Sequence, residues 1–147
     1  MMRACVRSVC GVLACAVMLA SIGCGDDSPT TPSTSTPTSS TELFTGTLSP
    51  GGSSFYSFTV TNAGTVSITL ASLASSRVGL VLPSRLTIGL GVPNGFGCAT
   101  TSTVDTAPGL TAQLTASGAK DNIYCVNLAD PGVLTGDVLF VIRIVHT

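Results

Sequence analysis

The fold of this chain is decided by the stretch Thr65-Val66-Ser67-Ile68-Thr69-Leu70. Apolar and hydroxyl residues alternate in it without a break, so an extended strand would carry all of its large apolar side chains on one face. Residues 54–60 alternate in the same way and place Tyr56, Phe58 and Val60 on one face. This period of two is typical of an antiparallel sheet with one buried and one solvated face. We therefore predict that the two stretches form paired, half-buried strands.

Similar short runs continue along the chain and are separated by residues that favour turns. Glycines and prolines crowd 91–109, which predicts a loop. In 110–116 we expect Leu110 and Leu114 to face inward. The run 138–145 is apolar at nearly every position, which predicts a central strand covered on both faces. The expected strands are 42–48, 54–60, 65–70, 78–82, 85–90, 110–116, 123–128 and 138–145.

This pattern indicates one all-β domain. Seven or eight strands at this spacing, with no helical periodicity, predict an antiparallel β-sandwich over residues 42–147. The whole chain has 147 residues, which suits a single domain with a short appendage.

Charged residues are few, at 9% of the chain. Removing residues 1–23 takes Arg3 and Arg7 from the 6 basic residues, which leaves 4 against 7 acidic ones and a net charge of −3. Phosphate contacts need clustered Lys and Arg, and four scattered cations cannot supply such a cluster. We therefore exclude nucleic acid as a partner.

Residues 1–23 have the pattern of a signal peptide. Arg3 and Arg7 form a positive n-region, and 9–20 is an apolar run of 12 residues. A membrane-spanning helix needs about 20 apolar residues, so this run is too short to be one and has the length of a signal-peptide h-region.

The stretch 19–27 resembles the lipobox of bacterial lipoproteins, with small residues before Cys24 and a sharp change to polar sequence after it. The resemblance implies that Cys24 is lipidated and becomes the mature N-terminus, which anchors the protein to a membrane. Two alternatives are an ordinary secretory signal and a lipidated Cys15, whose preceding residues also fit the local pattern.

Residues 24–41 read as a tether that begins with the lipidated cysteine. Ser, Thr and Pro make up 14 of the 17 residues in 25–41. Such a segment has almost nothing apolar to bury, so we expect it to be disordered. As a flexible coil it would have a root-mean-square end-to-end distance of roughly 20–25 Å.

Two of the six cysteines remain for the folded domain, because three leave with the signal peptide and Cys24 is assigned to lipid. An exported protein meets an oxidising compartment, so we predict a disulfide between Cys98 and Cys125. The alternative is a pair of buried free thiols.

Several stretches together resemble bacterial pre-peptidase C-terminal (PPC-type) domains and their lipoprotein relatives. The resemblance implies a jelly-roll-like sandwich and a non-catalytic accessory role. The stretches that carry it are Phe44-Thr45-Gly46-Thr47-Leu48, Gly51-Gly52, residues 56–60 and 64–70, Cys98, Tyr124-Cys125-Val126 and Asp130-Pro131-Gly132.

Catalysis has little support in the sequence. The only histidine is His146, at the end of the last expected strand, and a frayed strand end holds a general base poorly. The G-x-S-x-G motif of serine hydrolases is missing, and one histidine with two paired cysteines does not suit zinc. We therefore expect no catalytic residue, no cofactor and no enzyme activity.

Binding of calcium or a glycan is the alternative. Asp and Asn in turns could provide calcium ligands, although Asp is common in turns for local hydrogen bonding alone. Phe55 and Phe96 could stack on sugars, or else Phe55 could lie under a further layer and Phe96 could plug the space beside the disulfide. The calcium candidates are Asp121, Asn122, Asp130 and Asp137.

The expected function is that of an exported, non-enzymatic lipoprotein, anchored through Cys24 to the periplasmic or cell-surface face of the bacterial envelope. It would act as a structural or protein-interaction module, and an envelope protein or a glycan would be its partner. A glycan- or calcium-binding β-sandwich is the second hypothesis.

We predict that Cys24→Ser abolishes incorporation of a labelled fatty acid and releases the protein from membranes, because it removes the thiol that carries the lipid. Cys15→Ser is the matched control and should change neither property. Fatty-acid labelling followed by membrane fractionation measures both. Label that persists in the Cys24→Ser protein would contradict the lipobox interpretation.

Overall fold

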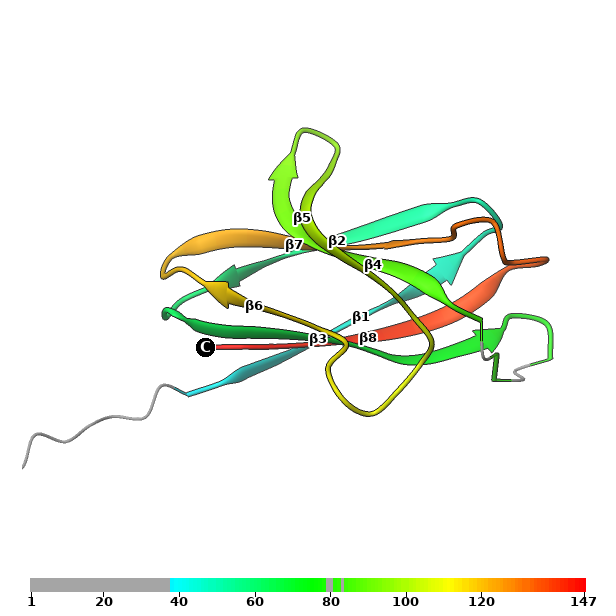
Figure 1. Ribbon diagram of the computed structural model, residues 1–147, viewed down its shortest axis with the longest axis horizontal. Helices are drawn as coiled ribbons and strands as arrows, with labels where there is room; N and C mark the ends of the chain where they lie inside the picture. Colours follow the sequence, from blue (N-terminus) through cyan, green and yellow to red (C-terminus); the bar gives the residue numbers. More distant parts are fainter. Residues whose placement is uncertain (1–37, 79–80, 83) are drawn as a thin grey trace, which may run out of the picture. The chain divides into compact units, whose positions relative to one another are not determined.

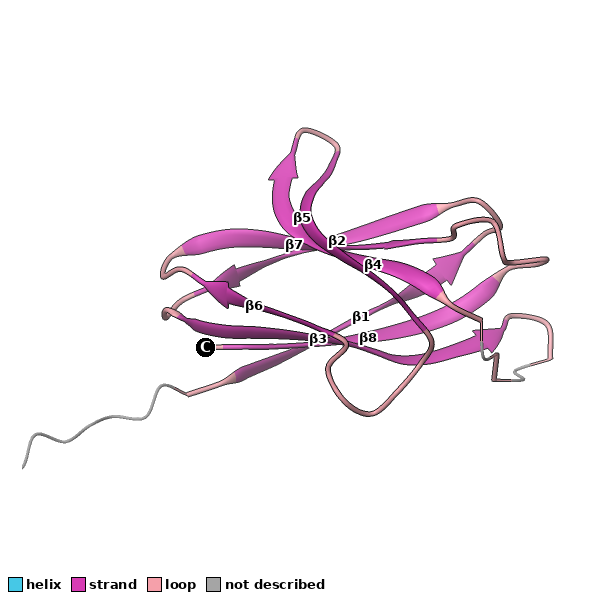
Figure 2. Cartoon of the chain, in the orientation of Figure 1, coloured by secondary structure: helices cyan, strands magenta, loops and turns pink. Residues whose placement is uncertain are grey.

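The computed structural model describes residues 38–78, 81–82 and 84–147. The predicted signal peptide, Cys24 and residues 25–37 of the tether lie outside these residues. The described residues form eight strands and no helix (Figures 1 and 2). The strands are β1 (Ser40–Leu48), β2 (Ser53–Val60), β3 (Gly64–Ser75), β4 (Leu86–Asn94), β5 (Gly97–Thr106), β6 (Leu114–Gly118), β7 (Asn122–Ala129) and β8 (Val138–His146).

The strands make two four-stranded antiparallel sheets that pack face to face. Sheet A has the order β1-β8-β3-β6, and sheet B has the order β2-β7-β4-β5. The chain passes between the sheets at every connection except the β4–β5 hairpin. Two interleaved Greek keys of this kind make a jelly roll, so the predicted jelly-roll-like β-sandwich is confirmed.

The predicted pairing of residues 54–60 with 65–70 is wrong. Strand β2 pairs with β7 in sheet B, whereas β3 pairs with β6 and β8 in sheet A. Alternation specifies which face of a strand is buried, but it does not specify the neighbouring strand. The short turn after β2 carries the chain across the sandwich to the other sheet.

The inward faces of both sheets form one apolar core. The predicted inward residues of β3 are at most 1% exposed, and Phe58 and Val60 of β2 are buried beside them. Phe44 meets the ring of Phe140 edge-on, with centroids 4.9 Å apart. Each fully buried large apolar side chain contributes about 1.5–3 kcal/mol, so this core is the main source of stability.

Strand β8 is central in sheet A, as predicted, but it is not covered on both faces. Its burial alternates along the strand, and Leu139 on the outward face is 48% exposed. Val141 and Val145 on the same face are half-buried. The described chain therefore leaves an aliphatic strand face open to solvent.

The predicted loop at 91–109 is wrong, because β4 continues to Asn94 and β5 begins at Gly97. Gly95 and Phe96 make a two-residue turn between the strands, and Gly95 adopts the positive φ (60°) that such turns favour. The glycines that suggest a loop instead serve a tight hairpin and a close approach of strands.

The predicted strand 110–116 is largely a loop. Only Leu114–Gly118 is extended, and Leu110 is 90% exposed rather than inward. Residues 107–113 run beside β3, where Gly109 N–H donates to the Leu70 carbonyl and the Gln113 side chain accepts from Leu70 N–H. These two bonds satisfy the backbone of Leu70 in β3, where the pairing with β6 has already ended. In the predicted strand 78–82, Val81 forms an isolated β-bridge with Ala74. Residues 79 and 80 of this predicted strand lie outside the described residues.

Gly91 lets the end of the β4–β5 hairpin bend. The register of the two strands shifts after Leu90, where Thr101 is the extra residue of a bulge. A Cβ atom at Gly91 would overlap the carbonyl oxygen of Ala99. The bend brings the distal half of the hairpin to the outer side of sheet B, from which it projects (Figure 1).

We predict that Gly91→Ala lowers the free energy of unfolding by about 2–3 kcal/mol, because backbone has to move to admit the methyl group. Gly97→Ala is the matched control in the same hairpin, since a Cβ there meets nothing within 4 Å. It should change stability by less than about 0.5 kcal/mol. Urea unfolding of both variants measures the difference, and equal stabilities would show that the close approach is not a constraint.

Candidate functional site

A disulfide holds the projecting hairpin in place. The sulfur atoms of Cys98 and Cys125 lie 2.04 Å apart, as the cysteine count predicts. Strand β4 separates β5 from β7, and Cys125 pairs with Gly91 in the register, so the bridge passes over this glycine. The loop it closes spans 27 residues, which is worth about 3.5 kcal/mol on the chain-entropy model.

The tip of this hairpin is apolar and open to solvent. Phe96 is completely exposed, and Val92 is 48% exposed. Between Arg85 and Asp105 the sequence has no charged residue. The expectation that Phe96 plugs the space beside the disulfide is therefore wrong, because the two-residue turn directs it away from the sheet.

Phe55 is not covered by a further layer of the described fold, contrary to one of the two expectations for it. It lies on the outward face of β2, opposite Asn127, and is 40% exposed. Ser57 on that face pairs with Cys125, so Phe55 lies on the side of sheet B from which the hairpin projects. Both aromatic candidates for glycan binding thus occur on one side of the domain.

Asp130 organises the loop between β7 and β8. Its Oδ1 accepts from the N–H groups of Gly132 (3.0 Å) and Val133 (2.8 Å), and Leu134 N–H bonds to both carboxylate oxygens. Its Oδ2 accepts from Gly51 N–H at 2.8 Å, which ties this loop to the β1–β2 turn. Burial alone would raise the pKa of Asp130, but the four N–H donors outweigh it and lower the pKa.

The calcium candidates do not converge. Asp130 is surrounded by N–H donors, whose partial positive charge would repel a cation. Asp121 Oδ2 lies 3.9 Å from Lys120 Nζ in an exposed turn, and Asp137 lies at the opposite end of the β7–β8 loop from Asp130. Over residues 38–147, apart from 79, 80 and 83, no three His, Cys, Asp or Glu side chains gather as metal ligands would.

His146 belongs to a polar cluster between the sheets. Its Nε2 lies 2.9 Å from Oε1 of Glu42, and the hydroxyl of Tyr56 donates to Oε2 of Glu42 at 2.6 Å. The hydrogen bond to Glu42, burial and the nearby negative charge all raise the pKa of Tyr56. Because a carboxylate can only accept, Nε2 of His146 is the donor in this contact, and its buried Nδ1 has no partner among the described residues.

The expectation of a frayed end at His146 is wrong. The side chain is 3% exposed, and Ser40 pairs with it across the sheet. The next residue, Thr147, bonds through its carbonyl and its hydroxyl to Asn62. The histidine is therefore buried inside the sandwich, bonded to Glu42 of its own sheet, and its ring lies 5.3 Å from that of Phe58 in sheet B. The sequence contains a signal for this placement: Glu42, Tyr56 and His146 each lie an even number of residues from the buried apolar residues of their own strand, so all three point inward.

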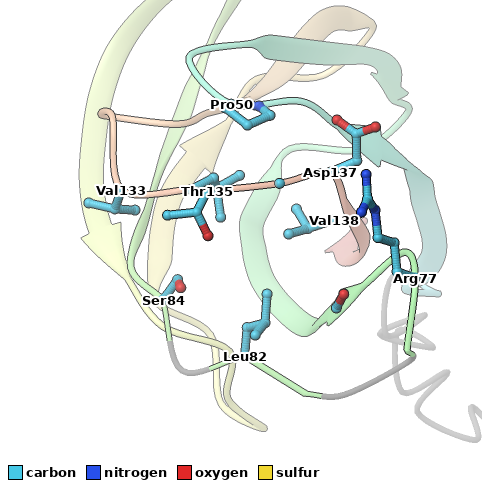
Figure 3. Close-up of a pocket in the computed structure, with 11 residues that line it drawn as sticks. Pro50, Arg77, Leu82, Ser84, Val133, Thr135, Asp137 and Val138 are labelled. Carbon is cyan, nitrogen blue, oxygen red and sulfur yellow. The ribbon is translucent and has the colours of Figure 1, made fainter.

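A cleft of about 460 Å³ opens at one end of the sandwich (Figure 3). Leu82, Leu134 and Val138 contribute apolar surface, and the charged side chains of Arg77 and Asp137 lie on one side of it. The lining thus holds one positive charge, one negative charge and several hydroxyl groups. This mixture does not favour one class of ligand, and we assign none.

The outward face of sheet A carries an aliphatic patch, which we call the sheet A stripe and define as Leu43, Leu139, Val141 and Val145. Leu43 is 62% and Leu139 48% exposed. Arg143 lies within the stripe, opposite Leu43, and its Nη2 donates to the carbonyl oxygen of Leu110 at 3.0 Å. Loop 107–113 thus covers only part of this face.

Comparison with known proteins found no family model that matches the chain, and no curated protein matches it. Nor does the described part of the chain include a helix long and apolar enough to cross a membrane.

We predict that Asp130→Asn reduces stability and flattens its dependence on acid pH. Because the fold lowers the pKa of Asp130, its contribution is complete above pH about 4, the ordinary range for aspartate. It is lost as the pH falls through the lowered pKa of the folded state. Thermal unfolding across acid pH tests this, with Asp121→Asn in an exposed turn as control. Parallel pH profiles for wild type and Asp130→Asn would contradict the assignment.

Proposed function

We propose that this chain is a non-enzymatic lipoprotein of the bacterial cell envelope and acts there as a structural or protein-interaction module. Residues 1–23 would be its signal peptide, residues from Cys24 its tether, and the β-sandwich its functional domain. Strand β1 begins at Ser40, two residues before the boundary drawn from sequence, so the tether would end at Ser39. The PPC-like identity of the domain is proposed from the sequence resemblance.

The anchor is supported by the distribution of cysteines. Cys98 and Cys125 are joined, and Cys5, Cys10 and Cys15 would leave with the signal peptide. Cys24 would then be the only free thiol of the mature chain. Lipidation requires a free thiol at the new N-terminus, and Cys24 would supply it.

A non-enzymatic role is supported by the fate of the polar groups that a hydrolase would use. His146 is buried and bonded to Glu42, and Asp130 is occupied by backbone N–H groups. Both residues hold parts of the fold together.

The single observation that carries the interaction role is the sheet A stripe. Apart from Arg143, the outward face of β8 is as apolar as the inward face, which is typical of strands covered on both sides. Loop 107–113 covers only part of the outward face, and Leu43 and Leu139 remain about half exposed or more. An envelope protein with an apolar surface would bury the stripe, and the flanking threonines of β1 would form a polar rim.

Glycan binding is the second candidate, because Phe55 and Phe96 are both exposed on the outer side of sheet B. Exposed aromatic faces can stack on sugar rings. Calorimetry with envelope glycans would show heat that both Phe55→Ala and Phe96→Ala diminish. The calcium hypothesis is weaker, since hydrogen bonds to N–H groups occupy Asp130.

We predict that a photo-crosslinking residue at position 139, placed in the full chain in its own cells, forms a discrete adduct with one envelope protein. Leu43→Glu should abolish that adduct, because a charge within the stripe opposes apolar contact. Thr59, exposed on the outward face of β2, is the control position and should give no adduct. Failure to crosslink at 139, or an adduct indifferent to Leu43→Glu, would exclude the stripe as the interface.

A further inference from the structure

The hairpin tip, Val92–Gly97, is largely exposed and carries no charge. Phe96 at its end is completely exposed, and Val92 is 48% exposed. The nearest charged residues in sequence are Arg85 and Asp105, both near the base of the hairpin. Isolated exposed apolar residues are common, but an aromatic residue at the extreme point of a projecting element is placed for contact.

The tip is also held in one conformation. Pro93 pairs with Cys98 and Asn94 with Gly97, so the strands remain paired up to the turn. The disulfide fixes the hairpin to β7 at the first of these pairs, through Cys98. A preorganised tip loses little conformational entropy when it binds, so even a small apolar surface can contribute to binding.

We propose that the hairpin tip inserts into the surface of the lipid bilayer to which the protein is anchored, with Phe96 in the interfacial region. This inference rests on the anchor in the proposed function. It adds a second membrane contact, made by the folded domain itself.

The shape and charge of the tip favour a bilayer over a protein pocket. The tip is convex and uncharged, and the exposed Asn94 amide is its one polar side chain. The boundary between headgroups and acyl chains accepts an exposed aromatic side chain and is hydrated enough for an amide. In the described chain the two strands pair only with each other beyond Gly91, so their outer backbone edges stay unpaired and the tip can enter the hydrated interfacial region but not the hydrocarbon core.

The anchor would supply the proximity that a weak contact needs. The 16 residues from Cys24 to Ser39 can extend to about 50 Å, compared with a radius of gyration of about 13 Å for a domain of this size. The tether could therefore bring any face of the domain to the bilayer, and it cannot select one. The local concentration that tethering provides lets a single aromatic residue make the selection.

The contact would orient the domain. The hairpin projects from the outer side of sheet B, away from sheet A (Figure 1). With the tip in the membrane, the sheet A stripe faces the aqueous compartment, where a protein partner can reach it. One side of the sandwich would thus contact lipid and the other would contact protein.

The chain has no tryptophan, so Phe96→Trp introduces a single reporter. The lipidated full-length protein is reconstituted into vesicles of phosphatidylethanolamine and phosphatidylglycerol, some of which carry acyl chains brominated near the headgroup. We expect the indole emission of this variant to shift to the blue and to be quenched by the brominated lipid. Leu110→Trp is the control, because Leu110 is 90% exposed and its carbonyl bonds to Arg143 on the sheet A side. Its emission should remain that of a solvated indole.

A second measurement uses the mature chain, residues 24–147, with Cys24→Ser, added to the same vesicles without the signal peptide or a lipid anchor. Phe96→Ala in this background should reduce partitioning about tenfold, because burying a Phe side chain is worth at least that factor. Phe55→Ala, at the other exposed aromatic residue, should leave it unchanged. Quenching at position 96 equal to that at position 110, or partitioning unaffected by Phe96→Ala, overturns the proposal.

These results separate the tip from the anchor. If Cys24→Ser releases the protein in cells but the Phe96→Trp indole is not quenched, the anchor stands and the tip proposal fails. If that indole is quenched but the chain carries no lipid, the tip proposal stands and the anchor fails. If the emission of the Phe96→Trp indole shifts to the blue only when a protein or a glycan is added, and not with vesicles alone, the tip binds that partner and the proposal is overturned.

Discussion

Contact between the inward faces of the two sheets is the constraint on which the rest of the structure depends. Successive strands lie in different sheets at every connection except the β4–β5 hairpin, so neighbouring strands in a sheet are mostly distant in sequence. Strand β1, for example, finds its partner in β8 at the other end of the domain. Neither sheet can form from local hairpins, and both depend on the apolar core to bring their strands together.

Polar groups connect the two sheets where the core ends. Glu42 and His146 belong to sheet A and Tyr56 belongs to sheet B, and their hydrogen bonds link the two. Asp130 joins the β7–β8 loop to the turn between β1 and β2. In both places a titratable group has a structural task, because its hydrogen bonds satisfy polar atoms that would each cost about 1–3 kcal/mol if buried without a partner. Nδ1 of His146 is the exception among the described residues. Residue type alone would have suggested chemistry at these positions.

The two outer faces of the sandwich differ, and this difference carries the functional proposals. Sheet A presents aliphatic side chains on a regular surface, whereas sheet B carries a pinned hairpin whose apolar tip projects from it. Gly91 and the disulfide together create that asymmetry: the glycine admits the bend, and the disulfide fixes it over β7. An anchored protein with such faces can contact a membrane on one side and a partner on the other.

The sequence by itself determined the fold class, the buried face of the regular strands and the cysteine pair. Residues 65–70 and 56–60 specify their inward faces through a period of two, which depends only on the geometry of an extended chain. The strand neighbours, the hairpin within 91–109 and the burial of His146 were decided by the tertiary structure. Glycine permits either a loop or a close approach of strands, and only packing selects between them. Phe96 could equally have been buried or exposed, and the turn that places it in solvent exists only once β4 and β5 have paired.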